Sequence, residues 1–152
     1  MGEAIHKLKA VGYWRPPRSL PSPRWLINCD WEADDRTRIT AYLRCGYTTE
    51  AWLGYSACRF RCGVDAHLMG SRDLTDGVWV WPQGLAHYVE EHDVMLPDAF
   101  LHTMRANEWK IPRGIADRLA EIRARWPQPM AGWDIEPWVA WAFQFKPWYV
   151  FW

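Results

Sequence analysis

The sequence predicts a single α+β domain in which a small antiparallel sheet packs with three to four helices around a stabilising zinc ion. Apolar residues make up 49% of the 152 residues and charged residues 24%, a balance typical of folded globular proteins. Apolar residues recur at helical spacing in some segments and at strand spacing in others. Two cysteines and two histidines occur as close pairs, which is how zinc ligands are usually supplied.

The length of the chain is enough for one domain with a hydrophobic core and short for two. Four prolines between residues 14 and 25 predict an extended segment, and Trp14 and Trp25 within it need burial. We therefore expect residues 1–27 to form a proline-rich N-terminal arm that packs on a single α+β domain spanning residues 28–152.

Helical periodicity is clearest in residues 113–126, where Ile115, Leu119 and Ile122 recur at intervals of three or four. Three other segments show shorter stretches of the same spacing and carry helix start or stop residues at their ends. The predicted helices span residues 33–45, 84–91, 97–106 and 113–126.

Strand patterns occur in three places. Residues 48–55 are rich in Thr, Trp and Tyr, and the VWVW run at 78–81 lies between a glycine and a proline. The tail at 132–152 alternates large and small residues, which predicts a strand with one apolar face. The intervening residues 67–77 are polar, and we expect a loop there.

Cys58 and Cys62 enclose three residues, and His87 and His92 enclose four, in the pattern C-x3-C-x24-H-x4-H. Structural zinc takes four thiolate or imidazole ligands in a tetrahedron, and Gly63 suits the turn after the second cysteine. The 24-residue interval is longer than in the common C2H2 finger, so that fold is excluded. We predict a zinc site at these four residues.

The spacing of the histidines imposes a geometric condition. Residues five apart in a straight α-helix are turned by roughly 500°, about 140° past alignment. His87 and His92 therefore reach one ion only if the helix stops or tightens near Glu91. Alternative fourth ligands are Cys45, His67 and Glu91. The competing interpretation is that the cysteines pack in the core, which is also where we expect Cys29 and Cys45.

No serine-hydrolase, P-loop or dinucleotide-binding glycine pattern is present, and HYVEEH at 87–92 lacks the spacing of zinc protease signatures. A zinc hydrolase with Glu90 or Glu91 as base remains the enzymatic alternative, and it requires a vacant position on the metal. Four protein ligands would fill the tetrahedron, so the sequence favours a structural metal over catalysis.

Formal net charge is zero, with 18 basic and 18 acidic residues. Nucleic-acid affinity comes mainly from surplus positive charge, so this balance disfavours a nucleic-acid-binding protein. That alternative would use arginines at the cysteine pair and on the 113–126 helix, namely Arg59, Arg61, Arg113, Arg118, Arg123 and Arg125. Residues 1–27 are basic and residues 71–100 acidic, and we expect these regions to pair within the fold.

Thirteen tryptophans are present, and burying one removes on the order of 200 Å² from water, so the domain cannot hide them all. Tryptophan is common in interface hot spots. We predict a partner-binding surface on the aromatic C-terminal segment, formed by Trp138, Trp141, Trp148 and Trp152. The tryptophans expected in the core are Trp79, Trp81, Trp109 and Trp126. Stacking of bases or sugar rings on exposed tryptophans is a further alternative.

The expected function is therefore protein–protein association by a zinc-stabilised chain, as an adaptor, a regulator, a toxin-neutralising partner or a homodimer. The sequence contains no apolar run of 18 residues, so it predicts no membrane span. The first residues lack the apolar core of an export signal. Four cysteines without such a signal indicate thiols or metal ligands, which points to the cytoplasm.

Overall fold

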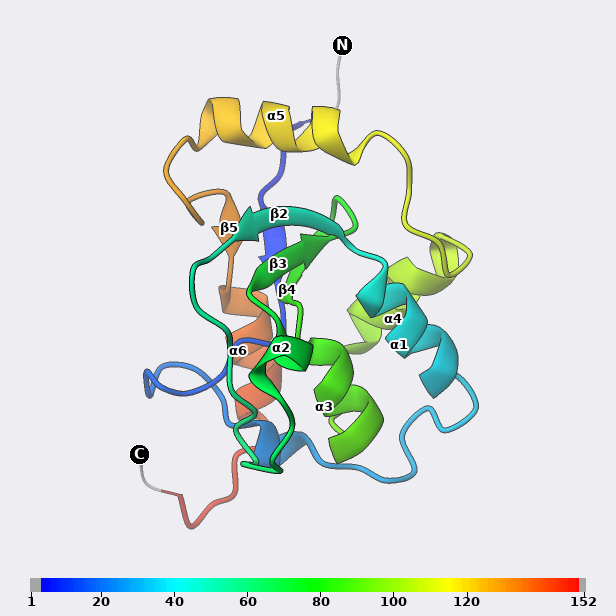
Figure 1. Ribbon diagram of the computed structural model, residues 1–152, viewed down its shortest axis with the longest axis vertical. Coiled ribbons are helices and arrows are strands. Elements are labelled where there is room, and N and C mark those ends of the chain that lie inside the picture. Colours follow the sequence, from blue (N-terminus) through cyan, green and yellow to red (C-terminus); the bar gives the residue numbers. More distant parts are fainter. Residues whose placement is uncertain (1–3, 151–152) are drawn as a thin grey trace.

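A five-stranded sheet with the strand order β2-β3-β4-β1-β5 is the framework of the computed structural model, which describes residues 4–150 (Figure 1). The strands are β1 (Leu8–Ala10), β2 (Tyr47–Ala51), β3 (Arg72–Thr75), β4 (Trp79–Pro82) and β5 (Trp133–Asp134). Neighbours β2, β3 and β4 are antiparallel, whereas β1 runs parallel to both β4 and β5. The expected antiparallel sheet is wrong for this half, because long crossovers rather than hairpins connect these strands.

Six helices surround the sheet within the described residues, more than the three to four expected. They are α1 (Arg36–Arg44), α2 (Ala66–Met69), α3 (Leu85–His92), α4 (Asp98–Ala106), α5 (Ile115–Arg125) and α6 (Glu136–Phe143). A 3-10 turn covers Pro23–Leu26. The four predicted helices are confirmed as α1, α3, α4 and α5, with ends that differ by up to three residues.

The predicted C-terminal strand is wrong, because residues 136–143 form α6 and, among the described residues of this segment, only Trp133–Asp134 form a strand. Trp138 and Ala142 are fully buried, whereas Ala140 between them, which would share their face in a strand, is exposed. This burial pattern is helical rather than alternating. Pro137 occupies the first turn, and the Asp134 carboxylate accepts a hydrogen bond from the N–H of Glu136 at 3.1 Å. These start signals outweigh an alternation that extends over only a few residues.

The loop expected at 67–77 is also wrong, because this stretch holds most of α2 and all of β3. Three of its polar side chains are buried and hydrogen-bonded, so their polarity does not indicate exposure: Asp73 is 5% exposed, Asp76 is 2% exposed and Thr75 is fully buried. The dipeptide Asp76-Gly77 at the end of this stretch, directly before the VWVW run, is a hairpin signal that would have predicted β3.

The sheet separates two hydrophobic clusters. Alternation along β4 directs Trp79 and Trp81 to the face covered by α1, α3, α4 and α6, and Val80 to the face covered by α5. Trp81 is fully buried, stacks on Tyr42 and donates a hydrogen bond from its Nε1 to the Leu43 carbonyl at 3.0 Å. Figure 1 shows α5 well separated from α1, α3 and α4.

The described part of the predicted arm, residues 4–27, contributes a strand to this framework. Strand β1 lies between β4 and β5 in the sheet, and Trp14 just after it is 6% exposed. The guanidinium of Arg15 lies over the ring of Trp25, 4.7 Å from its centroid. This cation–π contact attaches the proline-rich stretch to the 3-10 turn.

Asp76 is a buried polar centre that joins the β3–β4 hairpin to α1. It is 2% exposed, and its Oδ2 accepts a hydrogen bond from the Tyr42 hydroxyl at 2.6 Å. Its Oδ1 accepts from the N–H groups of Val78 and Trp79 at 2.9 and 2.7 Å. Burial raises the pKa of Asp76, and the hydrogen bonds oppose that rise.

Replacement Asp76→Ala is expected to lower the free energy of unfolding by about 3 kcal/mol, because two buried donors and one partly buried donor lose their acceptor. Each buried donor left unpaired costs roughly 1–3 kcal/mol before relaxation. Urea unfolding followed by circular dichroism measures this change. The control is Asp34→Ala at an exposed carboxylate, for which we expect a change within about 0.5 kcal/mol. Equal effects of the two substitutions would contradict the role of Asp76.

Candidate metal centre

The loop between β2 and α2 folds into a tight turn around the first cysteine. The N–H of Arg61 donates a hydrogen bond to the Cys58 carbonyl at 3.1 Å, and Arg61 and Gly63 both adopt positive φ, at 51° and 84°. Burial, together with the neighbouring Cys62 side chain, raises the pKa of the Cys58 thiol above its usual value, and hydrogen bonds from the backbone N–H groups of Phe60 and Cys62 offset only part of that rise. The turn therefore directs donors at this sulfur, an arrangement that stabilises a thiolate.

The two histidines lie on α3, where the last turn departs from α-helical geometry. His92 is the last helical residue, and Asp93 after it is left-handed with φ 55°. The N–H of Asp93 donates to the Tyr88 carbonyl five residues back, and the N–H of Val94 donates to the same oxygen at 3.2 Å. A turn closed by a five-residue bond is wider than an α-turn, so residues five apart approach a common face. The helix ends where expected, but the turn widens instead of tightening.

Arg36 of α1 holds this unusual helix end in place. Its guanidinium pairs with the Asp93 carboxylate and donates hydrogen bonds to the carbonyls of Asn28, Cys29 and Trp31, at 2.9, 3.1 and 3.1 Å. The side-chain hydrogen bond from Arg36 holds the pKa of Asp93 below its usual value. One arginine thus fixes the end of α3 to α1 and to the turn that precedes α1.

The four side chains predicted as zinc ligands converge. Cys58 Sγ lies 3.4 Å from His92 Nε2, Cys62 Sγ lies 3.4 Å from His87 Nε2, and the two Nε2 atoms are 3.2 Å apart. All four atoms lie within 4.8 Å of one another. A tetrahedral zinc ion with Zn–S of about 2.3 Å and Zn–N of about 2.05 Å requires S···N edges of about 3.5 Å and an N···N edge of about 3.3 Å. The side chains are close enough to hold one metal ion, and their spacing is compatible with zinc.

Hydrogen bonding alone accounts poorly for this cluster. A ring nitrogen carries either one hydrogen or one lone pair, yet each Nε2 here has two close neighbours, a sulfur and the other Nε2. One cation placed among them would satisfy all four atoms. Burial, followed by the neighbouring His92, lowers the pKa of His87, which favours the neutral imidazole that binds metals.

Aromatic contacts dock the cysteine turn on α3. The ring of Phe60 stacks on His92 with centroids 4.3 Å apart. The Arg24 guanidinium lies over the same Phe60 ring, 4.9 Å from its centroid. The N–H of Arg59 donates a hydrogen bond to the Tyr88 hydroxyl at 2.8 Å. These contacts restrict the orientation of the His92 ring and cover Cys58, which is 8% exposed.

The other candidate ligands lie outside the cluster found among residues 4–150. His67 contacts Asp65 instead, with 2.9 Å between Nδ1 and Oδ1. Cys29 and Cys45 are exposed, so the expectation that they are core thiols is wrong. Cys45 caps the end of α1, and Cys29 lies in the turn before that helix.

The geometry bears on the alternatives of hydrolysis and nucleic-acid binding. Four convergent ligands fill a tetrahedron, and Glu90, one candidate base, pairs with Arg44.

Several arginines of the nucleic-acid alternative are engaged within the fold. Arg59, Arg118 and Arg123 each donate hydrogen bonds to backbone carbonyls of the chain.

The predicted partner-binding tryptophans occupy different environments. Trp138 is fully buried and belongs to the core, because α6 turns it inward, and Trp141 stacks on it with partial burial. Trp148 is 87% exposed and Tyr149 beside it is 62% exposed. Trp152 lies outside the described residues. The exposed part of the aromatic tail is therefore limited, among the described residues, to its last few positions.

No protein-family model, curated protein or solved structure matches this chain. Within residues 4–150, no helix combines the length and the apolar character needed to cross a membrane. The function is therefore inferred from the geometry of the site.

Proposed function

We propose that Cys58, Cys62, His87 and His92 bind a structural zinc ion. The observation that carries this proposal is that two S···N distances and the N···N distance match the edges of a zinc tetrahedron, with all four atoms within 4.8 Å of one another. The ion would join a loop that is mostly exposed to a helix whose end is fixed by Arg36, and its binding free energy would become folding free energy. A reducing compartment such as the cytoplasm would keep both thiols available as ligands.

The chain itself is proposed to act by association with protein, through the exposed aromatic residues Phe145, Trp148 and Tyr149. Their exposed fractions are 39%, 87% and 62%, and such rings are typical anchors of interfaces. A second copy of the chain is the partner that the charge favours, because a net charge of zero gives no repulsion between copies. Roles as an adaptor, a regulator or a toxin-neutralising partner would use the same surface.

Purified protein is expected to carry one zinc ion per chain, measured by native mass spectrometry. Cys62→Ala should lose the metal, because three ligands bind zinc more weakly than four. Cys45→Ala is the matched control, since this exposed cysteine lies outside the cluster, and it should retain the ion. Wild-type protein that takes up no zinc, or a Cys62→Ala variant that keeps it, contradicts the site.

Removal of zinc by a chelator is expected to lower the free energy of unfolding by about 4 kcal/mol, relative to free zinc at about a thousand times its dissociation constant. The physical reason is that the ion binds the folded chain and little of the unfolded chain. Urea unfolding with and without zinc measures the difference. For Cys62→Ala, the free energy of unfolding should be the same with and without zinc. An equal effect of zinc on the wild-type chain and on Cys62→Ala would argue against a structural ion.

The double substitution Trp148→Ala and Tyr149→Ala is expected to weaken self-association at least tenfold, because hot-spot side chains contribute roughly 2 kcal/mol or more each. Sedimentation velocity over a range of concentrations measures the dissociation constant. Leu53→Ala removes a fully exposed apolar side chain elsewhere and should leave association unchanged. A wild-type chain that remains monomeric at every concentration rejects self-association.

A further inference from the structure

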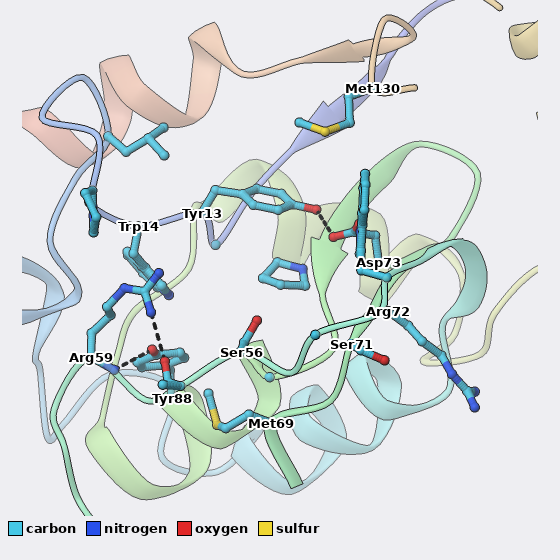
Figure 2. Close-up of a pocket in the computed structure, with 18 of the residues that line it drawn as sticks. Tyr13, Trp14, Ser56, Arg59, Met69, Ser71, Arg72, Asp73, Tyr88 and Met130 are labelled. Atoms are coloured by element: carbon cyan, nitrogen blue, oxygen red, sulfur yellow. Dashed lines mark hydrogen bonds between the residues drawn. The ribbon is translucent and has the colours of Figure 1, made fainter. Parts of the chain in front are cut away.

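A second site is formed by a cavity of about 350 Å³ on the other side of the cysteine loop (Figure 2). Its walls come from the segment after β1, the loop after β2, the β3–β4 hairpin and α3. This volume lies within the range of about 300–1,000 Å³ that is usual for small-molecule sites. None of the four proposed zinc ligands lines it, so it is a separate site.

Aromatic side chains form most of the flat walls of this cavity. They are Tyr13, Trp14, Trp52, Tyr88 and Trp133. Figure 2 shows Tyr13 and Trp14 along one side of the cavity, with Met69 and Tyr88 across from them. Rings of this kind bind flat, apolar bodies by stacking and edge contacts, and their faces attract cations.

The polar feature of the cavity is the carboxylate of Asp73, which is 5% exposed. Its Oδ1 accepts a hydrogen bond from the Tyr13 hydroxyl at 2.7 Å, and its Oδ2 accepts from Trp52 Nε1 at 2.6 Å. Both donors are neutral, and none of the ion pairs within residues 4–150 involves this carboxylate. An ionised carboxylate offers about four lone-pair sites, so further N–H donors can be accepted.

Burial raises the pKa of Asp73, and the hydrogen bonds from Trp52 and Tyr13 lower it. A buried carboxylate that lacks a cationic partner is costly, and a bound cation would compensate its charge. The Asp73 carboxylate thus complements a positive group.

Two arginines also line the cavity, and both direct their charge elsewhere. The guanidinium of Arg59 donates hydrogen bonds to the carbonyls of Arg15 and Ala57, at 2.8 and 3.0 Å, and Figure 2 places it at the opposite end from Asp73. The side chain of Arg72 extends away from the cavity in the same view. A cation is therefore favoured only at the Asp73 end.

We propose that this cavity binds a small organic cation, an amine or amidinium carried on a flat aromatic body. The nitrogen donates hydrogen bonds to Asp73, and the ring lies between the aromatic walls. The Tyr13 hydroxyl, which already donates to Asp73, accepts a further N–H from the ligand. The binding site depends on the cavity and its carboxylate, and not on the identity of the metal.

The probe is benzamidine, and the matched controls are benzamide and benzoate, which keep the ring and change the charge. The Trp52 Nε1–H resonance, assigned with Trp52→Phe, reports on the site because this group is bonded to Asp73. Benzamidine should shift it saturably with a dissociation constant on the order of 1 mM, about −4 kcal/mol. Benzamide and benzoate should bind at least tenfold more weakly.

Two variants locate the binding. Asp73→Asn keeps the shape of the side chain and should abolish the preference for benzamidine over benzamide. Ser56→Phe leaves the carboxylate intact and places a ring in the cavity, toward which Ser56 points in Figure 2, so it should block all three probes. Thermal melts establish that each variant is folded, and Ser56→Phe still tests the site if Asp73→Asn unfolds. Benzoate binding as tightly as benzamidine, unchanged binding in either folded variant, or no saturable shift overturns the proposal.

Discussion

The widened last turn of α3 is the constraint on which the convergence of the four proposed ligands depends. In a straight α-helix, residues five apart are turned about 140° from one another. The wide turn begins at Tyr88, directly after His87, and includes His92. The carbonyl of Tyr88 accepts both N–H groups of this turn, and its hydroxyl accepts the N–H of Arg59 from the cysteine loop. Tyr88 therefore connects the two halves of the ligand set, and the pairing of Arg36 with Asp93 keeps the left-handed residue in place.

Local patterns predicted much of the fold, because they report directly on local structure. The spacing of Ile115, Leu119 and Ile122 predicted α5, and the VWVW run predicted β4. The two Cys and His pairs indicated which four side chains would meet. The shape of the helix end was not predictable in this way, since it depends on Arg36, which lies 57 residues before Asp93 in the chain.

The errors also have physical causes. Asp73 and Thr75 looked like loop residues because the sequence does not show that Tyr13, 60 residues earlier, donates a hydrogen bond to the aspartate. Trp138 looked like a surface residue because a strand and a helix present different faces of the same aromatic segment. Once that segment is helical, this tryptophan points inward and donates a hydrogen bond to the Tyr13 carbonyl at 3.0 Å.

The cysteine loop has two sides, and each side faces a different candidate site. Cys58 faces the histidines, while its neighbours Ala57 and Arg59 line the aromatic cavity. A metal bound at the four proposed ligands would order this loop, and with it one wall of the cavity, before any ligand arrives. Thermodynamic reciprocity would then require that a ligand in the cavity strengthen metal binding by the same factor by which the metal strengthens binding of that ligand. A strip of chain that forms a shared partition would thus make the two sites interdependent without any contact between their occupants.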